Sequence, residues 1–250
     1  MENALNYRKV SFSDIPNWLA HGWHMFGQTR NASMAYAGIF AVIGAILLVS
    51  AIALDLAPMV FPLAGGFMLV GPVFLSGFFH VATLRTKQMP IRFNDFFVGF
   101  RRSPASLWAI SLICAFLFLI WLTDAAIVYS LYFGTAPLLE SLKLVAWLGE
   151  SGKLLSFTLF CSLTGSVLAF MIFAVSAFSV PLIFCRRSDL PKAVGTSVRA
   201  VFGNFGVMIA WGSLLATVLG GAILLFIPLF VVAFPVLAYA GEQAYRDVCA

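Results

Sequence analysis

The three histidines of this sequence, His21, His24 and His80, are the first residues whose type and spacing could support chemistry. His21 and His24 lie one helical turn apart, which is an allowed spacing for two metal ligands. His80 is expected at a similar depth, so the three could converge on a metal ion or a haem. No carboxylate is indicated beside them, and ordinary amphipathic histidines at a headgroup boundary are the alternative. The histidines are therefore a weak candidate site, and no cofactor is predicted.

Asp124 is a second candidate, because it is a carboxylate inside a long apolar segment. A charge within a membrane is costly to bury, so such a residue is a candidate transport or proton site. Asp124 lies about 17 residues into its segment, or roughly 25 Å along a helix. That position also fits a solvated helix end at the outer boundary, which is the alternative interpretation.

Glycine and proline interrupt the apolar segments at Gly71, Pro72, Pro181 and Pro235. Proline removes a backbone donor and frees a carbonyl group, whereas small residues let helices pack closely. We predict structural hinges or packing sites at these four positions. A gated transport pathway is the alternative, because interrupted spans at corresponding positions are typical of transporters.

The elements that must position these residues are membrane-spanning helices. Only 10% of the residues are charged and 62% are hydrophobic, whereas soluble domains carry about 25% charged residues. A spanning helix needs about 20 apolar residues. The sequence therefore predicts an all-α integral membrane protein with six transmembrane helices, at about residues 32–54, 59–84, 107–133, 154–184, 205–220 and 222–243.

The last two predicted spans come from one uncharged run, which we expect to fold into a hairpin at Gly220-Gly221. A single helix of that length would be roughly 57 Å long, too long for one crossing of a hydrocarbon core about 30 Å thick. If the run were nevertheless one bent helix, the C-terminus would lie on the opposite side of the membrane.

The basic residues indicate how the chain is threaded. All but two of the 15 Lys and Arg residues lie in the N-terminal arm, in two later polar gaps or at the C-terminus. The two exceptions are Lys143 and Lys153. The positive-inside rule then predicts that the N-terminus and the C-terminus are both cytoplasmic. Anionic lipid headgroups are the expected partners of these cytoplasmic basic loops, and nucleic acid is not.

Three amphipathic segments, at residues 15–26, 93–100 and 190–202, precede the span pairs. The first begins Ser13-Asp14-Ile15-Pro16 and the third Ser188-Asp189-Leu190-Pro191. Each segment is too polar to cross a membrane and apolar enough to lie in its interface. We interpret residues 1–250 as one membrane domain of three repeats, each an interfacial amphipathic helix plus a transmembrane hairpin, at about 11–87, 88–187 and 188–250. Chance similarity among apolar segments is the alternative.

Three stretches together resemble an uncharacterised family of bacterial six-span inner-membrane proteins. They are Ser13-Asp14-Ile15-Pro16 with Phe26-Gly27, the run from Pro62 to Pro72, and Ser188-Asp189-Leu190-Pro191. The resemblance implies this fold and a bacterial inner-membrane location, but no activity. Some members bear the label of cytochrome c oxidase subunit I. That label does not fit, because the haem and copper ligands of such a subunit need more histidines than this chain has.

No nucleotide-binding loop, Ser/His/Asp arrangement or metalloprotease helix occurs in the sequence, so an enzyme is not expected. We predict a non-catalytic inner-membrane protein that is an accessory or assembly subunit of a larger membrane complex, with respiratory complexes among the candidates. Its expected partners are other membrane-protein subunits. A small-molecule or ion transporter, or a channel-like protein, is the alternative. A redox subunit that uses the three histidines is a third hypothesis.

Overall fold

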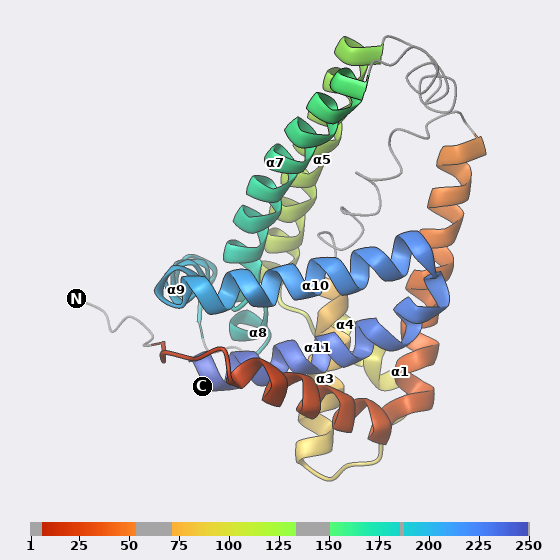
Figure 1. The fold of residues 1–250 in the computed structure, drawn as a ribbon. Coiled ribbons are helices and arrows are strands. Elements are labelled where there is room, and N and C mark those ends of the chain that lie inside the picture. The colour runs from red at the N-terminus through yellow and green to blue at the C-terminus, as the bar shows by residue number, and fades with distance from the viewer. Residues whose placement is uncertain (1–6, 54–71, 134–150, 186–187, 250) are drawn as a thin grey trace.

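The computed structural model describes residues 7–53, 72–133, 151–185 and 188–249. Within these residues all regular structure is helical, which confirms the prediction of an all-α protein for this part of the chain. Figure 1 shows how the helices are arranged. Their bounds are α1 (Asp14–Ala53), α3 (Pro72–Thr86), α4 (Phe93–Arg101), α5 (Ala105–Phe133), α7 (Ser151–Ser176), α8 (Ser179–Phe184), α9 (Leu190–Gly203), α10 (Phe205–Leu225) and α11 (Ile227–Cys249).

Five stretches of the described chain are helical, long and apolar enough to cross a membrane. They are Asp14–Ser50, Ala105–Leu131, Leu159–Phe184, Phe205–Ile223 and Ile227–Cys249. The second predicted span, residues 59–84, lies largely outside the described residues. Its described end is α3, whose 15 residues make a helix about 22 Å long. Six spans and the threefold repeat therefore stay predictions.

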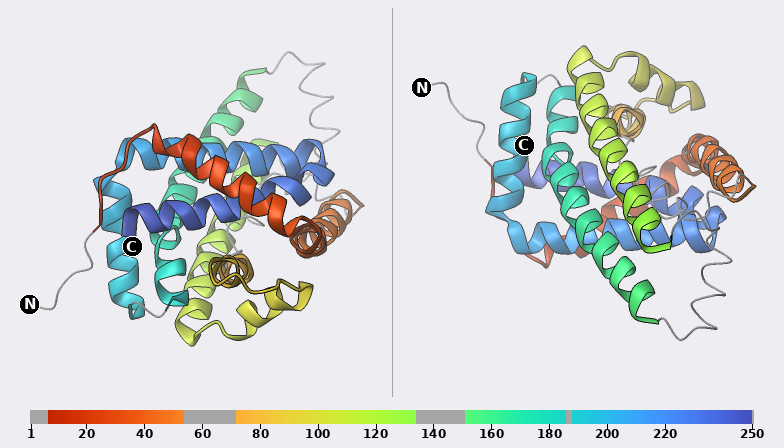
Figure 2. Two further views of the ribbon diagram at one scale, coloured as in Figure 1. Left: turned by 90° about the horizontal axis from the view of Figure 1, so that it is seen from below. Right: turned by 90° about the horizontal axis from the view of Figure 1, so that it is seen from above.

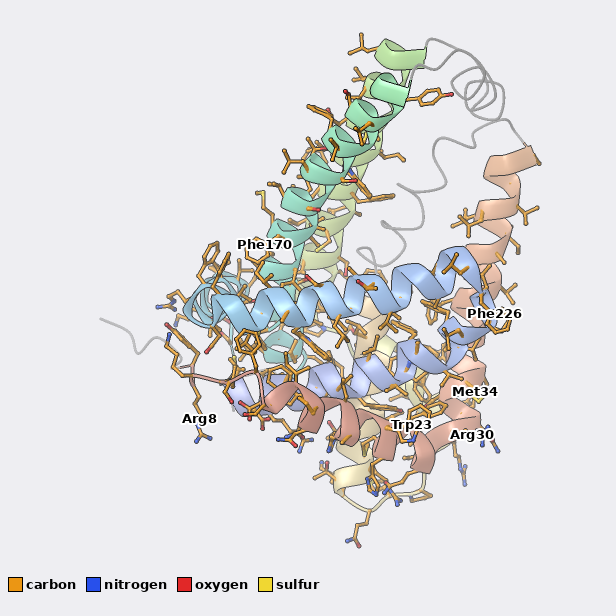
Figure 3. All side chains as sticks on the ribbon, in the orientation of Figure 1. Arg8, Trp23, Arg30, Met34, Phe170 and Phe226 are labelled. Atoms are coloured by element: carbon orange, nitrogen blue, oxygen red, sulfur yellow. The ribbon has the colours of Figure 1, made fainter. Side chains whose placement is uncertain are left out.

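Helix α1 joins the first amphipathic segment and the first span into one helix of 40 residues. It bends into two arms, with Trp23 on the first arm, Arg30 at the corner and Met34 on the second arm (Figure 3). Just before the corner, the Thr29 hydroxyl donates a hydrogen bond to the Met25 carbonyl oxygen at 3.0 Å. Back-bonding of this kind bends a helix without ending it. The segment predicted as a separate interfacial helix is therefore the first arm of α1.

Helix α11 is the central helix of the body and lies between α10 and the first arm of α1 (Figure 1). The backbones of α1 and α11 approach closely at Gly22. A Cβ atom at Gly22 would overlap the Val236 carbonyl oxygen and would lie 3.0 Å from the Ala240 Cβ atom. Aromatic rings fill the space between α1, α3, α4 and α11, namely those of Tyr36, Phe78, Phe96, Phe234 and Tyr239.

Helices α5 and α7 form a pair that leaves the body crosswise to α10 and α11 (Figures 1 and 2). The Trp121 ring of α5 covers Gly165 of α7, where a Cβ atom would lie 2.9 Å from the ring. The pair contacts the body through α3, α8 and α9. Its outward sides carry exposed apolar side chains, including Leu112, Phe116, Leu119, Leu131, Leu155, Leu159, Leu163 and Val167.

The last apolar run forms two helices, α10 and α11, which pack against each other. The turn between them is at Phe226, with φ of −156° and ψ of 82°, and not at Gly220-Gly221 as expected from the sequence. Both glycines lie inside α10, and no atom lies close to where their Cβ atoms would be. Pro228 explains the position of the turn, because proline is tolerated in the first turn of a helix and not in its interior.

Helix α9 buries only part of the apolar stripe in its sequence, which is Leu190, Val194, Val198, Val201 and Phe202. Its buried residues are Ala193, Thr196, Ser197, Ala200 and Val201. Phe202 is exposed, and Val194 and Val198 are half-buried. Small side chains let α9 approach α7 and α8 closely, and the larger apolar side chains other than Val201 are left nearer the surface.

Candidate functional site

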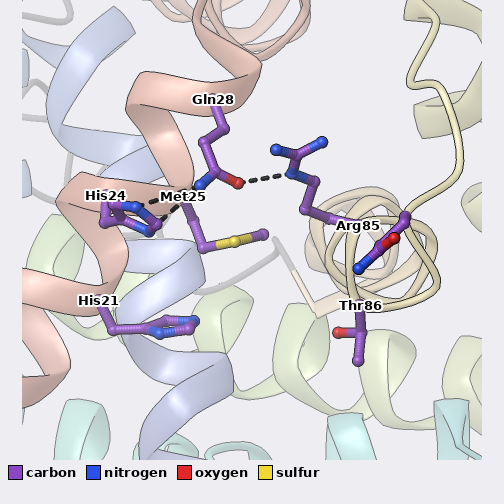
Figure 4. Close-up of a pocket in the computed structure, with 7 residues that line it drawn as sticks. His21, His24, Met25, Gln28, Arg85 and Thr86 are labelled. Atoms are coloured by element: carbon purple, nitrogen blue, oxygen red, sulfur yellow. Dashed lines mark hydrogen bonds between the residues drawn. The ribbon is translucent and has the colours of Figure 1, made fainter.

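An open depression lies between the first arm of α1 and the end of α3, with a volume of about 670 Å³ (Figure 4). Its lining is His21, His24, Met25 and Gln28 from α1, with Arg85, Thr86 and Gln88 from the end of α3 and the turn after it. The depression therefore brings together two of the three histidines singled out in the sequence. It also adds an arginine and two amide side chains that the sequence did not link to them.

Gln28 connects the two walls of the depression. Its Oε1 atom accepts a hydrogen bond from Arg85 Nε at 2.6 Å. Its Nε2 atom lies 3.2 Å from His24 Nε2 (Figure 4). Because Arg85 fixes the carbonyl side of this amide, the amide NH₂ group points to the His24 ring, which accepts the hydrogen bond.

The end of α11 closes one side of this region. Arg246 donates from Nη2 to Thr86 Oγ1 at 3.3 Å and from Nε to the buried Glu242 at 2.5 Å. Asp247 accepts hydrogen bonds from Trp18 Nε1 at 2.8 Å and from Gln243 Nε2 at 2.9 Å. These contacts tie α1, α3 and α11 together, and they occupy both carboxylates.

His80 does not join the other two histidines. It lies on the side of α3 that faces α4, where a Cβ atom at Gly99 would lie 2.8 Å from the His80 Cβ atom. The charged residues that act on it are Arg102, Asp95 and Lys87. Within the described residues, no three His, Cys, Asp or Glu side chains are grouped so as to hold a metal ion. A three-histidine metal or haem site is therefore not assembled in this structure.

Asp124 lies on α5, far along the chain from the depression, and its side chain is half-buried. It is near enough to Cys161 of α7 for the two groups to interact electrostatically. The carboxylate thus belongs to the contact between α5 and α7. The structure does not bring His21, His24 or Arg85 to it.

The proline positions have different surroundings. Gly71 lies outside the described residues, and Pro72 is the first residue of α3. Pro235 is buried inside α11, which continues through it. Pro181 lies in α8, just after the helix breaks between α7 and α8.

Ser197 of α9 fills the break before Pro181. Its hydroxyl donates to the Ala174 carbonyl oxygen at 2.7 Å and accepts from the Phe178 backbone N–H at 3.1 Å. The Ala174 carbonyl and the Phe178 N–H, which the break would leave without helical partners, are therefore satisfied by a side chain from another helix.

Sequence reasoning missed the polar groups that join α1 to α11. The Tyr239 hydroxyl lies 2.9 Å from Ser33 Oγ and 3.1 Å from Thr29 Oγ1, and the last two atoms are 2.8 Å apart. All three side chains are buried. The sequence did indicate the α1 side of this contact, because Gly22, Thr29 and Ser33 are small residues at helical spacing. Nothing in the sequence indicated that Tyr239 is their partner.

Asn204, between α9 and α10, is a second group that the sequence did not reveal. Its side-chain amide donates to the Arg8 carbonyl oxygen at 3.1 Å and accepts from the Val10 backbone N–H at 3.0 Å. The Arg8 backbone N–H donates in turn to the Val248 carbonyl oxygen at 2.8 Å. The N-terminal arm is thereby held against the end of α11, so the two ends of the described chain lie together (Figure 1).

These observations define the class: an all-α, multi-pass integral membrane protein with a polar depression at one edge of its body. The chain belongs to the family described as "Predicted integral membrane protein (DUF2189)", whose model matches residues 60–184. The matched part runs through α3, α4, α5, α7 and α8. The expected membership of an uncharacterised membrane family is thus confirmed. No curated protein and no solved structure matches the chain.

Proposed function

We propose that this protein is a non-catalytic subunit that assembles with another membrane protein through the α5–α7 pair. The observation that carries the proposal is the geometry of this pair, which leaves the body with exposed apolar side chains on both outward sides that no other described helix covers. A bacterial inner-membrane complex, respiratory complexes included, is the proposed setting.

The outward side of α7 suits a partner helix better than lipid alone. Ser162 and Ser166 are exposed and lie four residues apart. Neither hydroxyl makes a hydrogen bond within the part of the chain that the structure describes. Small residues at this spacing let a second helix approach, and a hydroxyl in hydrocarbon gains from a partner across the contact. Leu159 and Leu163, exposed beside them, add apolar contact area.

Transport is the alternative that the sequence leaves open, and two features of the body count against it. The aromatic rings of Tyr36, Phe78 and Phe96 fill the space between α1, α3 and α4. The proline break before α8 is occupied by Ser197. A subunit that packs against a partner needs neither an open interior nor exposed backbone groups at the break.

Site-specific photo-crosslinking in native membranes tests the proposal. A photoreactive phenylalanine analogue is placed at Leu163 on α7, which is 67% exposed, and at Val49 on α1, which is 66% exposed. We expect one discrete adduct from position 163, to a different membrane protein that also copurifies in mild detergent at a fixed ratio. Equal labelling at the two positions would overturn the proposal. So would an adduct to a second copy of this chain, or recovery as a lone monomer.

The proposed orientation has both termini in the cytoplasm. Nitrogen-tipped side chains, Arg8 and Arg30 among them, gather along the lower edge of the molecule, away from the outer ends of α5 and α7 (Figure 3). The positive-inside rule assigns such an edge to the cytoplasm. Protease added to sealed inside-out vesicles should then remove a C-terminal tag, and a protected tag would contradict the orientation.

A further inference from the structure

The depression between α1 and α3 presents hydrogen-bond donors that nothing in the described chain uses. Arg85 donates a hydrogen bond only from Nε, to Gln28. Its two Nη groups make no hydrogen bond with any described residue. The His21 ring and the Gln88 amide also lack a hydrogen bond to the described chain. The unused groups thus include a guanidinium fork, an imidazole and an amide.

The carboxylate and hydroxyl acceptors around the depression, in contrast, already have donor partners. Glu242 is paired with Arg246, and Asp247 accepts from Trp18 and Gln243. Thr86 Oγ1 accepts from Arg246 and donates to the Ala82 carbonyl oxygen. A ligand at this place therefore meets donors and positive charge, which is the arrangement that recognises an anion.

The turn after α3 holds Gln88 in a strained backbone conformation at the edge of the depression. Gln88 has a φ of 56°, in the left-handed region that favours glycine. The Gln88 N–H donates to the Arg85 carbonyl oxygen, and the Met89 N–H donates to the Leu84 carbonyl oxygen. This is a Schellman ending, in which glycine usually takes the position of Gln88. Strain of this kind tends to lie at functional sites, and here the amide side chain lines the depression.

We propose that this depression binds a phosphate group, with the Arg85 guanidinium as the main ligand and His21 and Gln88 as further donors. A guanidinium matches the geometry of phosphate oxygens with two parallel N–H donors. Gln28 positions Arg85 by holding its Nε. The volume of about 670 Å³ lies within the roughly 300–1,000 Å³ of small-ligand sites. The phosphate can come from an anionic lipid headgroup at the membrane boundary or from a soluble phosphate compound.

Binding to the purified full-length protein in detergent tests this site. The probes are phosphatidylglycerol, phosphatidylcholine and inorganic phosphate, and binding is followed by native mass spectrometry and by thermal stabilisation. Retention of phosphatidylglycerol without competition by inorganic phosphate identifies a lipid headgroup, whereas competition identifies a soluble phosphate compound. The site is refuted if the wild-type protein binds none of the probes, or binds the two lipids equally without competition by phosphate.

Two variants locate the binding. Arg85→Gln should weaken it about tenfold, because a charge-assisted contact is lost. Arg199→Gln, at an exposed arginine on α9, is the matched control and should bind like the wild type. Gln88→Gly removes the amide and relieves the strained backbone, so it should bind about fivefold more weakly while melting at a higher temperature. If Arg85→Gln and Gln88→Gly both fold and bind like the wild type, the assignment of the site is wrong.

Discussion

Helices α11 and α5 are both long and rich in apolar residues, yet they have opposite surroundings. In the most apolar 18-residue stretch of α11, 50% of the residues are buried inside the protein. In the corresponding stretch of α5, 22% are buried. α11 contacts the first arm of α1 along its length, whereas α5 contacts mainly α7. Apolar composition therefore does not decide which helix becomes the centre of the body.

The difference lies in small residues and hydroxyl groups. Lipid is as apolar as a leucine side chain, so helices in a membrane associate through close packing and hydrogen bonds. The α1–α11 contact has both, with Gly22 against Val236 and a hydroxyl group of Tyr239 between two others. The α5–α7 contact has the close approach at Gly165 and Trp121. Three changes test whether this distinction explains the fold.

The largest effect is expected at Gly22. Gly22→Val places side-chain atoms where the Val236 carbonyl oxygen lies, and neither helix backbone can move without disturbing the body. We expect the free energy of unfolding to fall by about 3 kcal/mol, measured by denaturation in mixed micelles. Gly27→Val is the matched control on the same helix, because nothing lies within 4 Å of a Cβ atom there. Similar losses in the two variants would show that close approach is not what joins α1 to α11.

A smaller effect is expected at the buried hydroxyl groups. Tyr239→Phe and Ser33→Ala each remove one partner of the 2.9 Å contact. A double-mutant cycle should give a coupling energy of about 0.6 kcal/mol, the average for hydrogen bonds between membrane helices. Each single variant alone should keep the fold, as judged by elution in detergent. A coupling energy of zero would leave packing alone as the cause of the α1–α11 contact.

The smallest effect is expected on the outward side of α7. Leu163→Ala should change the free energy of unfolding of the isolated protein by less than about 0.5 kcal/mol, because the side chain touches little of it. Ile172→Ala, at a buried residue of the same helix, should cost about 2 kcal/mol and is the internal comparison. A large loss at Leu163 would mean that this side of α7 is covered within the protein, and the contrast with α11 would fail.

Much of the secondary structure could be predicted because it follows from local pattern. Periodic apolar residues located the helices of residues 93–101 and 190–203, and the long uncharged runs located α5, α7, α10 and α11. The faces of the helices could not be predicted. The amphipathic segment predicted at residues 93–100 contains the neighbouring Phe96 and Phe97, yet Phe96 is buried and Phe97 is exposed. In a membrane an apolar side chain gains similarly from lipid and from protein, so its position in the sequence does not show which it contacts.

The candidate site was predictable only in part, for a related reason. The one-turn spacing of His21 and His24 places them on neighbouring positions of one helix, and the structure keeps them together. Their partners come from elsewhere in the chain, because Arg85 lies in the last turn of α3 and Arg246 in the last turn of α11. His80, which the sequence placed with them by depth alone, faces α4. The predicted depth of a residue in the membrane gives only its position along the helix axis. The rotation of the helix about that axis, which decides the direction of the side chain, is set when neighbouring helices pack against it.

The sequence by itself determined that the chain is helical and belongs in a membrane, because composition and charge spacing act on each segment separately. Only the tertiary structure decided that α11 becomes the centre of the body, that Ser197 closes the break before Pro181 and that Asn204 holds the N-terminal arm. Each of these depends on contacts between segments far apart in the chain. Such contacts are selected by shape and hydrogen bonding, which a pattern of apolar and polar residues does not record.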